Sequence, residues 1–300
     1  MSDASSPAAA PRRRGPAAGP LLVRKLRALD AELAAAIPRV LHASDDEAIH
    51  DLRVAIRRLR TLLKLARPVF GRFHADSVRA AFTVVHRATG ALRDEEVLEE
   101  TLDAVTCDSP SFIAWKMRRR ARERSLRRGV VGRLRAGDLS RARRLLKALV
   151  TLPVNPARDR PAAKLCRRAV EGARRGVERM RDAPTEDAVA LHDLRIAYKE
   201  LRYAAELLAD ALPADLAAMA IPAAKFQKRL GEIHDADMAL AALKRARGLD
   251  PTTHAAALAG LESLRAKRVA KYVAEMAPHA GDPEVPDAPA SETVLRVATR

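Results

Sequence analysis

The sequence predicts an all-α protein made of two four-helix bundles that arose by internal duplication and are related by a pseudo-twofold axis. Three observations favour this fold. Hydrophobic residues make up 48% of the 300 residues but aromatic residues only 3%, a composition that suits helices better than strands. Apolar residues recur at helical spacing in nearly every segment. Finally, two motifs each occur twice at almost the same separation, which indicates a repeated unit of about 140 residues.

The first half is expected to contain a disordered tail, residues 1–20, and a bundle, residues 21–152. Its first helix spans residues 21–41, with apolar residues at positions 22, 26, 29, 33 and 37. "SDDE" from Ser44 then offers a cap and an acidic first turn for a helix that Pro68 should stop. Further helices are expected over residues 72–89, 91–102, 109–128 and 140–152.

The second half follows a predicted linker, residues 153–161, and repeats this order over residues 162–278. Helices are expected over residues 162–181, 188–212, 214–230, 232–243 and 251–276, and a loose tail over residues 279–300. The isolated Gly90 and Gly231, one in each half, are expected to permit a bend or close helix packing.

The repeat itself consists of two motifs. "HDLR" begins at His50 and again at His192, 142 residues later. "TGALRDEEVL" matches "LGEIHDADMA" at an offset of 141, which places Gly90 over Gly231 and Arg93 over His234. Two motifs at one separation predict that the two HDLR helices hold equivalent positions.

Each HDLR helix has a cationic face opposite its apolar face. At about 100° per residue, one arc of the first helix collects His50, Arg53, Arg57, Arg60 and Lys64. The same arc of the second helix collects His192, Arg195, Lys199, Arg202 and Tyr203. A solvated face would be the simpler interpretation, but such faces usually mix both signs of charge. Two like-signed rows in register favour an anion, and the first spans about 21 Å, a length that suits an extended chain of phosphates.

The overall charge agrees with an anionic partner. The net charge is +17 and the pI is about 10.7, which predicts a nucleic acid, an anionic membrane or a phosphate polymer. Most of the excess lies in residues 112–181, with 23 Lys and Arg against 5 Asp and Glu. Two cysteines give no disulfide framework, and no segment is typical of a signal peptide or a membrane span, so we expect a cytoplasmic protein without membrane insertion.

Three His-Asp pairs raise the alternative of a metal-dependent phosphohydrolase, beginning at His50, His192 and His234. Adjacent helical residues diverge by about 100°, and the repeated pairs share their faces with cations that would repel a metal. We therefore expect no metal and no cofactor, with Asp51 and Asp193 instead pairing with a neighbouring Arg or a helix N-terminus. No phosphate-binding glycine loop or nucleophile elbow is present in the sequence.

With "HDLRVAIRRLR", "GALRDEEVL", "HDLRIAYKELRY" and "LGEIHDADMA" in this order, the chain resembles the CHAD family, the conserved-histidine α-helical domain. The resemblance implies two four-helix bundles around a basic central groove or pore that binds inorganic polyphosphate, in some members at polyphosphate granules. It carries the family's histidines to His50 and His192. The complete candidate polyphosphate-binding set is His50, Arg53, Arg57, Arg58, Arg60, Lys64, Arg93, His192, Arg195, Lys199, Arg202, Tyr203, Lys228 and His234.

The sequence departs from the family pattern in places. Glu200 stands where the first half has Arg58, and His234 stands where the family often has Asn. The ExExK signature of the triphosphatase domain that accompanies many relatives is absent. The leading hypothesis is therefore non-enzymatic binding of inorganic polyphosphate, in which the histidines donate hydrogen bonds, more strongly when protonated. A nucleic-acid-binding protein and a metal-dependent polyphosphate hydrolase are the alternatives, and the oligomeric state stays open.

Overall fold

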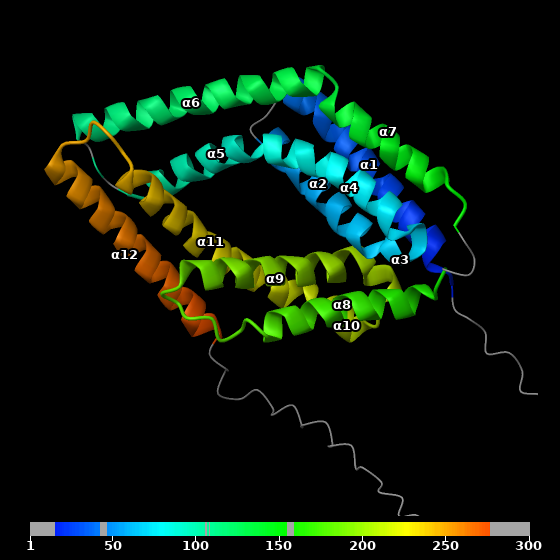
Figure 1. Ribbon diagram of the computed structural model, residues 1–300. Coiled ribbons are helices and arrows are strands. Elements are labelled where there is room, and N and C mark those ends of the chain that lie inside the picture. Colours follow the sequence, from blue (N-terminus) through cyan, green and yellow to red (C-terminus); the bar gives the residue numbers. More distant parts are fainter. Residues whose placement is uncertain (1–15, 43–46, 106, 108, 155–158, 277–300) are drawn as a thin grey trace, which may run out of the picture.

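The computed structural model describes residues 16–42, 47–105, 107, 109–154 and 159–276 (Figure 1). These residues form an all-α fold, as the sequence predicts, and the described part contains no strand beyond an isolated bridge between Ala17 and Pro161. No helix within it is long and apolar enough to span a membrane.

The first half of the chain forms seven labelled helices in the described part: α1 (Ala18–Leu41), α2 (Ala48–Leu65), α3 (Arg67–Phe70), α4 (Arg72–Ala88), α5 (Gly90–Asp103), α6 (Pro110–Arg135) and α7 (Asp138–Thr151). The second half forms α8 (Ala162–Glu178), α9 (Ala188–Leu208), the short 3-10 helix η1 (Ala209–Ala211), α10 (Ala214–Ala218), α11 (Ala220–Lys244) and α12 (Pro251–Met276).

Most expected helices are present, and the differences have physical causes. Pro68 begins a short helix instead of only ending one, because it lies in the first turn of α3, where an N–H group would have no partner. The bend expected at Gly90 separates α4 from α5. At Gly231 the alternative of close helix packing is confirmed instead of a bend: α11 runs through this residue unbroken, and a Cβ atom there would lie 3.7 Å from Arg195 Nε of α9. This packing outweighs the cost of a helical glycine, about 1 kcal/mol.

Two expectations fall on residues that the structure does not describe. Ser44, the expected cap, lies outside the described residues, and so does the whole tail 279–300. Of the predicted linker, residues 153–154 and 159–161 are described, and the latter lie against the start of α1. The backbone N–H of Gly19 donates to Asp159 Oδ1 at 2.8 Å, and the N–H of Ala18 donates to the carbonyl of Arg160 at 2.9 Å. The beginning of α8 is thereby fixed beside the beginning of α1.

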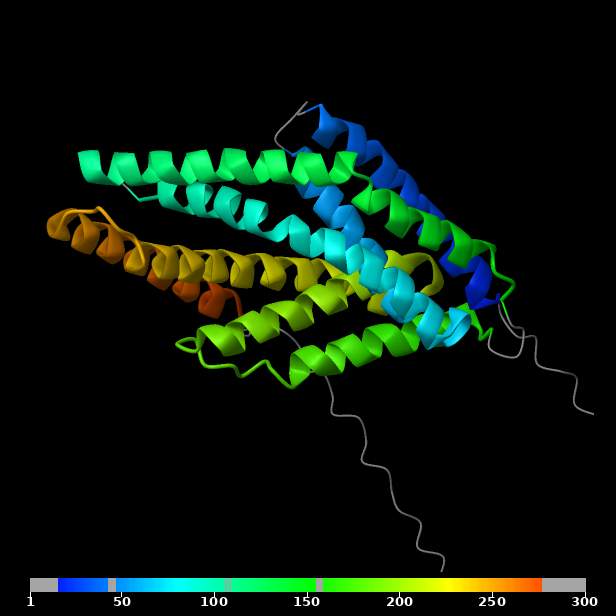
Figure 2. The same ribbon diagram turned by 45° about the horizontal axis from the view of Figure 1, so that its top comes forward.

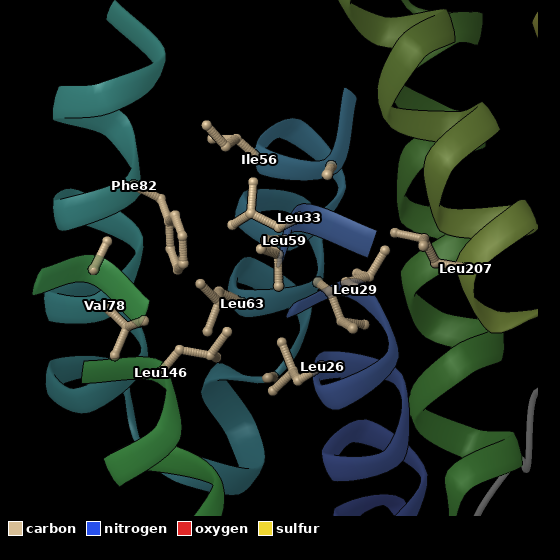
Figure 3. Packing of buried hydrophobic residues seen from close by; sticks show 14 of the residues in the cluster. Leu26, Leu29, Leu33, Ile56, Leu59, Leu63, Val78, Phe82, Leu146 and Leu207 are labelled. Atoms are coloured by element: carbon tan, nitrogen blue, oxygen red, sulfur yellow. The ribbon is translucent and has the colours of Figure 1, made fainter. Parts of the chain in front are cut away.

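The largest hydrophobic core lies among α1, α2, α4 and α7 (Figure 3). On α2 the apolar residues at helical spacing, such as Ile56, Leu59 and Leu63, are fully buried. They pack around Phe82 of α4, whose ring is also fully buried. Leu207 of α9 joins the same cluster, so the second half of the chain contributes to this core. Because this apolar face of α2 is buried, the cationic face on the opposite side of the helix points away from the core.

A second core lies within the second half of the chain, and a third core connects the two halves. One lies among α8, α9, α11 and α12. The other combines α5 and α6 of the first half with α11 and α12 of the second, for example Leu98 and Phe112 with Leu240 and Leu261. Figures 1 and 2 show α5 beside α11, with α6 on the other side of α5. Because residues of both halves share cores, the division into two separate four-helix bundles stays a prediction.

Candidate polyanion-binding groove

A groove of about 830 Å³ lies where α2 and α9 meet, with α4 and α8 forming its other sides. We call it the central groove. Its charged and polar lining consists of Arg53, Arg57, Arg60, Thr61 and Lys64 of α2, Arg79 and His86 of α4, Arg179 after α8, and Asp193, Arg195, Lys199, Glu200 and Tyr203 of α9. The cationic rows of the two HDLR helices therefore face one common space.

Amphipathicity of the two helices causes this arrangement. Leu52 and Leu59 of α2 and Leu194 and Leu208 of α9 are buried in the hydrophobic cores. Because a helix separates its apolar and polar residues onto opposite sides, burial of one face presents the other to the groove. The crossing of α2 and α9 then brings the two polar faces together (Figure 1).

The cations of the central groove have few anionic partners. Arg53 donates to two neutral oxygens, Thr89 Oγ1 at 2.7 Å and the carbonyl of His86 at 3.2 Å. Arg60 donates to Thr83 Oγ1 at 3.0 Å. The remaining groove cations without a salt bridge to a carboxylate in the described part of the chain are Arg57, Arg79, Arg179, Arg195 and Lys199. Arg57 Nε is also buried without a hydrogen-bond partner there.

Arginines elsewhere in the protein are commonly neutralised. Arg143 pairs with Asp30 at 2.6 Å, Arg265 pairs with Asp237 at 2.6 Å, and Arg119 pairs with Glu95 at 2.8 Å. Within the central groove, Lys64 has such a partner, Glu200, at 2.8 Å. The groove thus concentrates positive charge that the protein itself leaves largely uncompensated.

Burial and mutual repulsion lower the pKa values of these cations. Burial lowers the pKa of Lys199 to about 8, and the nearby Arg195 and Arg57 lower it further. Burial and Arg57 lower the pKa of Arg53 to about 10. The pKa of Arg195 is lowered by burial and then by Arg57. Such shifts indicate that the free groove disfavours positive charge, and a bound anion would relieve this cost.

The histidines near the groove are held neutral. Burial, followed by Arg53 and Arg60, lowers the pKa of His86 to about 3. Burial also lowers the pKa of His192, and it lowers the pKa of His234 to about 4. His192 of α9 and His234 of α11 contact each other, with their Nδ1 atoms 3.4 Å apart and ring centroids 4.6 Å apart.

Tyr203 forms part of the groove wall. Its side chain is buried, and two guanidinium groups lie over its ring. The Cζ atom of Arg57 is 5.8 Å and that of Arg202 is 5.7 Å from the ring centroid. Cation–π attraction of this kind contributes about 0.5–1 kcal/mol and holds the Arg57 guanidinium at the groove.

The structure brings together half of the candidate residues. Those that line the central groove are Arg53, Arg57, Arg60, Lys64, Arg195, Lys199 and Tyr203. The candidates outside its lining are His50, Arg58, Arg93, His192, Arg202, Lys228 and His234. For each of these residues, a role in binding stays a prediction.

Several candidates outside the lining have acidic partners. Arg58 points to Glu32 at 3.5 Å and to Glu206 at 3.9 Å. Arg202 pairs with the same Glu206 at 2.6 Å, which leaves both guanidinium groups neutralised beside the groove. For Arg58 this position follows from the helix geometry, since it points about 100° away from the neighbouring Arg57 on α2.

The remaining candidates lie on α2, α5 and α11. Arg93 pairs with Glu96 at 3.3 Å and, together with burial, lowers the pKa of the half-buried His50. Lys228 is exposed on α11. None of these residues lines the central groove.

Three groove cations or potential cations were not anticipated from the sequence: Arg79, His86 and Arg179. A signal existed on α4, where Arg79, Thr83 and His86 follow at helical spacing and therefore share one face. Without a second copy of this pattern, nothing in the sequence distinguishes it from an ordinary solvated face.

No metal centre is formed by the described residues: they contain no group of three or more His, Cys, Asp or Glu side chains that could hold an ion. Asp51 pairs with Arg39 at 2.6 Å, which confirms the prediction that this carboxylate has an arginine partner. Asp193 lines the central groove among the cations.

The fold and the groove define a helical protein in which two repeated cationic helices face one binding space. The sequence matches the family model of the CHAD domain over residues 24–244, and the chain belongs to this family. The resemblance noted from the sequence is thereby confirmed.

Two solved structures share the fold. The CHAD domain from the plant Ricinus communis has a TM-score of 0.68 and 22% sequence identity, over 88% of this chain and 92% of that one. PptA from Streptomyces chartreusis has a TM-score of 0.65 and 19% identity, over 87% of this chain and 98% of that one. No curated protein matches the sequence.

Proposed function

We propose that this protein binds inorganic polyphosphate in the central groove without cleaving it. The observation that carries the proposal is the convergence of the α2 and α9 cations on one groove that contains few carboxylates. Membership in the CHAD family supports it, since the family resemblance implies a polyphosphate ligand.

The chemistry of the groove suits phosphate oxygens. Arginine offers a planar fork that donates two hydrogen bonds to one phosphate, and Arg53, Arg57 and Arg195 all lie at the groove. Lys199 adds a point charge, and burial and the neighbouring Arg195 lower its pKa to about 8. A polyanion would supply the negative charge that the surrounding side chains lack.

The shape of the groove favours a chain over a single phosphate. From Arg53 to Lys64 the cationic row extends over 11 residues, about 16 Å of helix. An orthophosphate ion would contact only a small part of this row. We therefore expect the affinity to rise with polyphosphate length and to fall steeply with salt concentration, because the contacts are ionic.

Binding without hydrolysis is proposed on chemical grounds. Cleavage of phosphoanhydrides commonly relies on acidic metal ligands, whereas the described groove residues are mainly cations, with Asp193 and Glu200 as its carboxylates. The test is phosphate release in the presence of Mg²⁺, Mn²⁺ or Zn²⁺. Release above the uncatalysed rate would contradict a purely binding role.

Calorimetric titration with orthophosphate, tripolyphosphate and a long polyphosphate tests the ligand and the site together. The variant R53A/R195A should lose about 100-fold or more in affinity, since a hydrogen bond to a charged group contributes about 1.5–3 kcal/mol. The matched control is R124A/R128A on α6, which removes the same charge from two exposed residues outside every groove described here. Equal losses in the two double variants, or equal affinity for orthophosphate and the long chain, would refute the proposal.

Nucleic acid is the second candidate, favoured by the net charge of +17. Single-stranded nucleic acid usually stacks its bases on aromatic side chains. Among the described residues lining the groove, Tyr203 is the one Phe, Tyr or Trp, and it is only 4% exposed. We expect nucleic acid to leave bound polyphosphate in place at equal phosphate concentration, and displacement would favour this alternative. Polyphosphate binding would also bring the protein to polyphosphate granules, as the resemblance implies.

A further inference from the structure

A second cavity of about 350 Å³ lies next to the central groove, between the end of α2 and the beginning of α8. The two cavities share Lys64, Leu65 and Ala169 in their walls, so they are neighbours at Lys64. The charged residues that line the second cavity beyond Lys64 are Arg67, Arg160, Lys164 and Arg168. A second group of cations thus lies along a path that leads out of the groove.

Three of these cations form a row that we call the outer segment: Arg160, Lys164 and Arg168. Lys164 and Arg168 are one turn apart on α8 and share a face of the helix, and Arg160, which precedes α8, lines the same cavity. All three are exposed, and within the described part of the chain none forms a salt bridge. Arg67, in contrast, is held by Asp76 at 2.7 Å. No acidic residue among those described lines this cavity.

At the junction of the two cavities lies the salt bridge between Lys64 and Glu200. Its Nζ and Oε1 atoms are 2.8 Å apart, and the two side chains are 42% and 50% exposed. Glu200 occupies the position on the second HDLR helix that corresponds to Arg58 on the first, 142 residues earlier. An acid therefore stands where the charge pattern of the first helix has a cation, and it neutralises Lys64 between two positive regions.

We propose that the outer segment is a second polyphosphate subsite and that Glu200 separates it from the central groove. This inference rests on the proposed function. A short chain is held in the central groove, whereas a chain long enough to pass Lys64 also contacts Arg160, Lys164 and Arg168. The protein thereby distinguishes polyphosphates by length.

The energies are consistent with such a division. An exposed salt bridge contributes about 0–1 kcal/mol, so a polyphosphate that takes Glu200's place at Lys64 loses little. Exposed contacts with the outer segment are individually weak for the same reason and are screened by salt. Their combined effect is still measurable because a long chain makes several of them at once.

The test compares R160A/K164A/R168A with wild-type protein, using tripolyphosphate and a long polyphosphate as ligands. We expect a loss on the order of 10-fold for the long chain and less than about 2-fold for tripolyphosphate. Comparing variant with wild type separately at each length cancels the statistical advantage of a polymer with many binding positions. E200Q should raise the affinity for the long chain more than that for tripolyphosphate.

The matched control is R124A/R128A/R135A, three exposed cations of α6, a helix on the other side of the molecule from α8 (Figures 1 and 2). It removes the same charge and should reduce long-chain affinity by less than about 2-fold. An unchanged affinity of the α8 variant for long polyphosphate, or equal losses at both lengths, would overturn the second subsite while leaving the proposed function intact. If wild-type protein binds neither ligand, the proposed function itself fails.

Discussion

Replacing Arg57 by Met should make the free protein more stable while weakening its polyphosphate binding. Arg57 lies in the central groove, where its Nε is buried without a hydrogen-bond partner in the described structure. Its charge contributes to the lowered pKa of Arg53, Arg195 and Lys199. Methionine keeps an unbranched apolar side chain that can pack like the stem of arginine, so the substitution mainly removes repulsion.

The size of the effect follows from opposing contributions. Relief of repulsion within a half-buried cluster is worth on the order of 1–2 kcal/mol at an effective dielectric constant of about 20 with salt screening. Loss of the cation–π contact with Tyr203 costs about 0.5–1 kcal/mol. We expect a net gain of up to about 1 kcal/mol, or about 2–4 °C in Tm for a chain of this size. Affinity should fall about 10- to 150-fold, since one charged hydrogen-bonding group is lost.

The adjacent Arg58 provides the matched control. It pairs with Glu32 and Glu206 outside the groove lining, so R58M should change stability by less than about 1 kcal/mol and affinity by less than about 3-fold. Thermal unfolding in phosphate-free buffer measures the first quantity, and calorimetric titration with polyphosphate measures the second. A lower Tm for R57M with unchanged affinity would refute the electrostatic reasoning, and so would equal behaviour of the two variants.

Two further predictions concern Lys199 and the core. The pKa of Lys199 is about 8 in the free protein, below its usual value, so it destabilises the fold fully below pH 8 and progressively less as the pH rises toward 10.5. Because polyphosphate binding favours the charged form of Lys199, the affinity should fall above pH 8 by at most about tenfold per pH unit. Titrations at several pH values should show a flatter dependence for K199M. The same slope in K199M would contradict the pKa given for Lys199. In the core, F82A should lower the free energy of unfolding by about 3–5 kcal/mol, because the ring is fully buried. Urea denaturation measures this, and a change below about 1 kcal/mol would show that the ring is not packed as described.

Helical periodicity predicted the groove residues of the HDLR helices because their side-chain directions depend only on local geometry. Arg57 and Arg58 illustrate this: periodicity placed Arg57 in the cationic row, whereas Arg58 was added through the family resemblance. The structure agrees with the periodicity: Arg57 lines the groove, whereas Arg58, about 100° away on the helix, lies near carboxylates. Whether Arg58 affects binding is decided by the R58M measurement.

The other walls of the groove were beyond sequence reasoning. Arg79, His86 and Arg179 belong to α4 and the end of α8, which tertiary packing brings beside α2 and α9. Such contacts join residues far apart in the chain, and no repeated motif identified them. For a related reason the sequence left two alternatives open at Gly231, a bend or close helix packing. Packing along α9 and α12, which joins distant residues, keeps α11 helical there.

The histidines require a different account from the one that the sequence suggested. Protonated histidines were expected to strengthen phosphate binding, but burial holds the pKa of His234 at about 4 and lowers that of His192, so both rings are neutral at pH 7. A neutral imidazole carries one N–H group. The two Nδ1 atoms lie 3.4 Å apart, and a hydrogen bond between them requires one ring to carry its N–H on Nδ1 and the other to accept there. The accepting ring then carries its proton on Nε2, so the neutral pair offers a phosphate one Nε2–H donor at a time. A bound phosphate that raises the pKa of one histidine enough to protonate it would add a second donor.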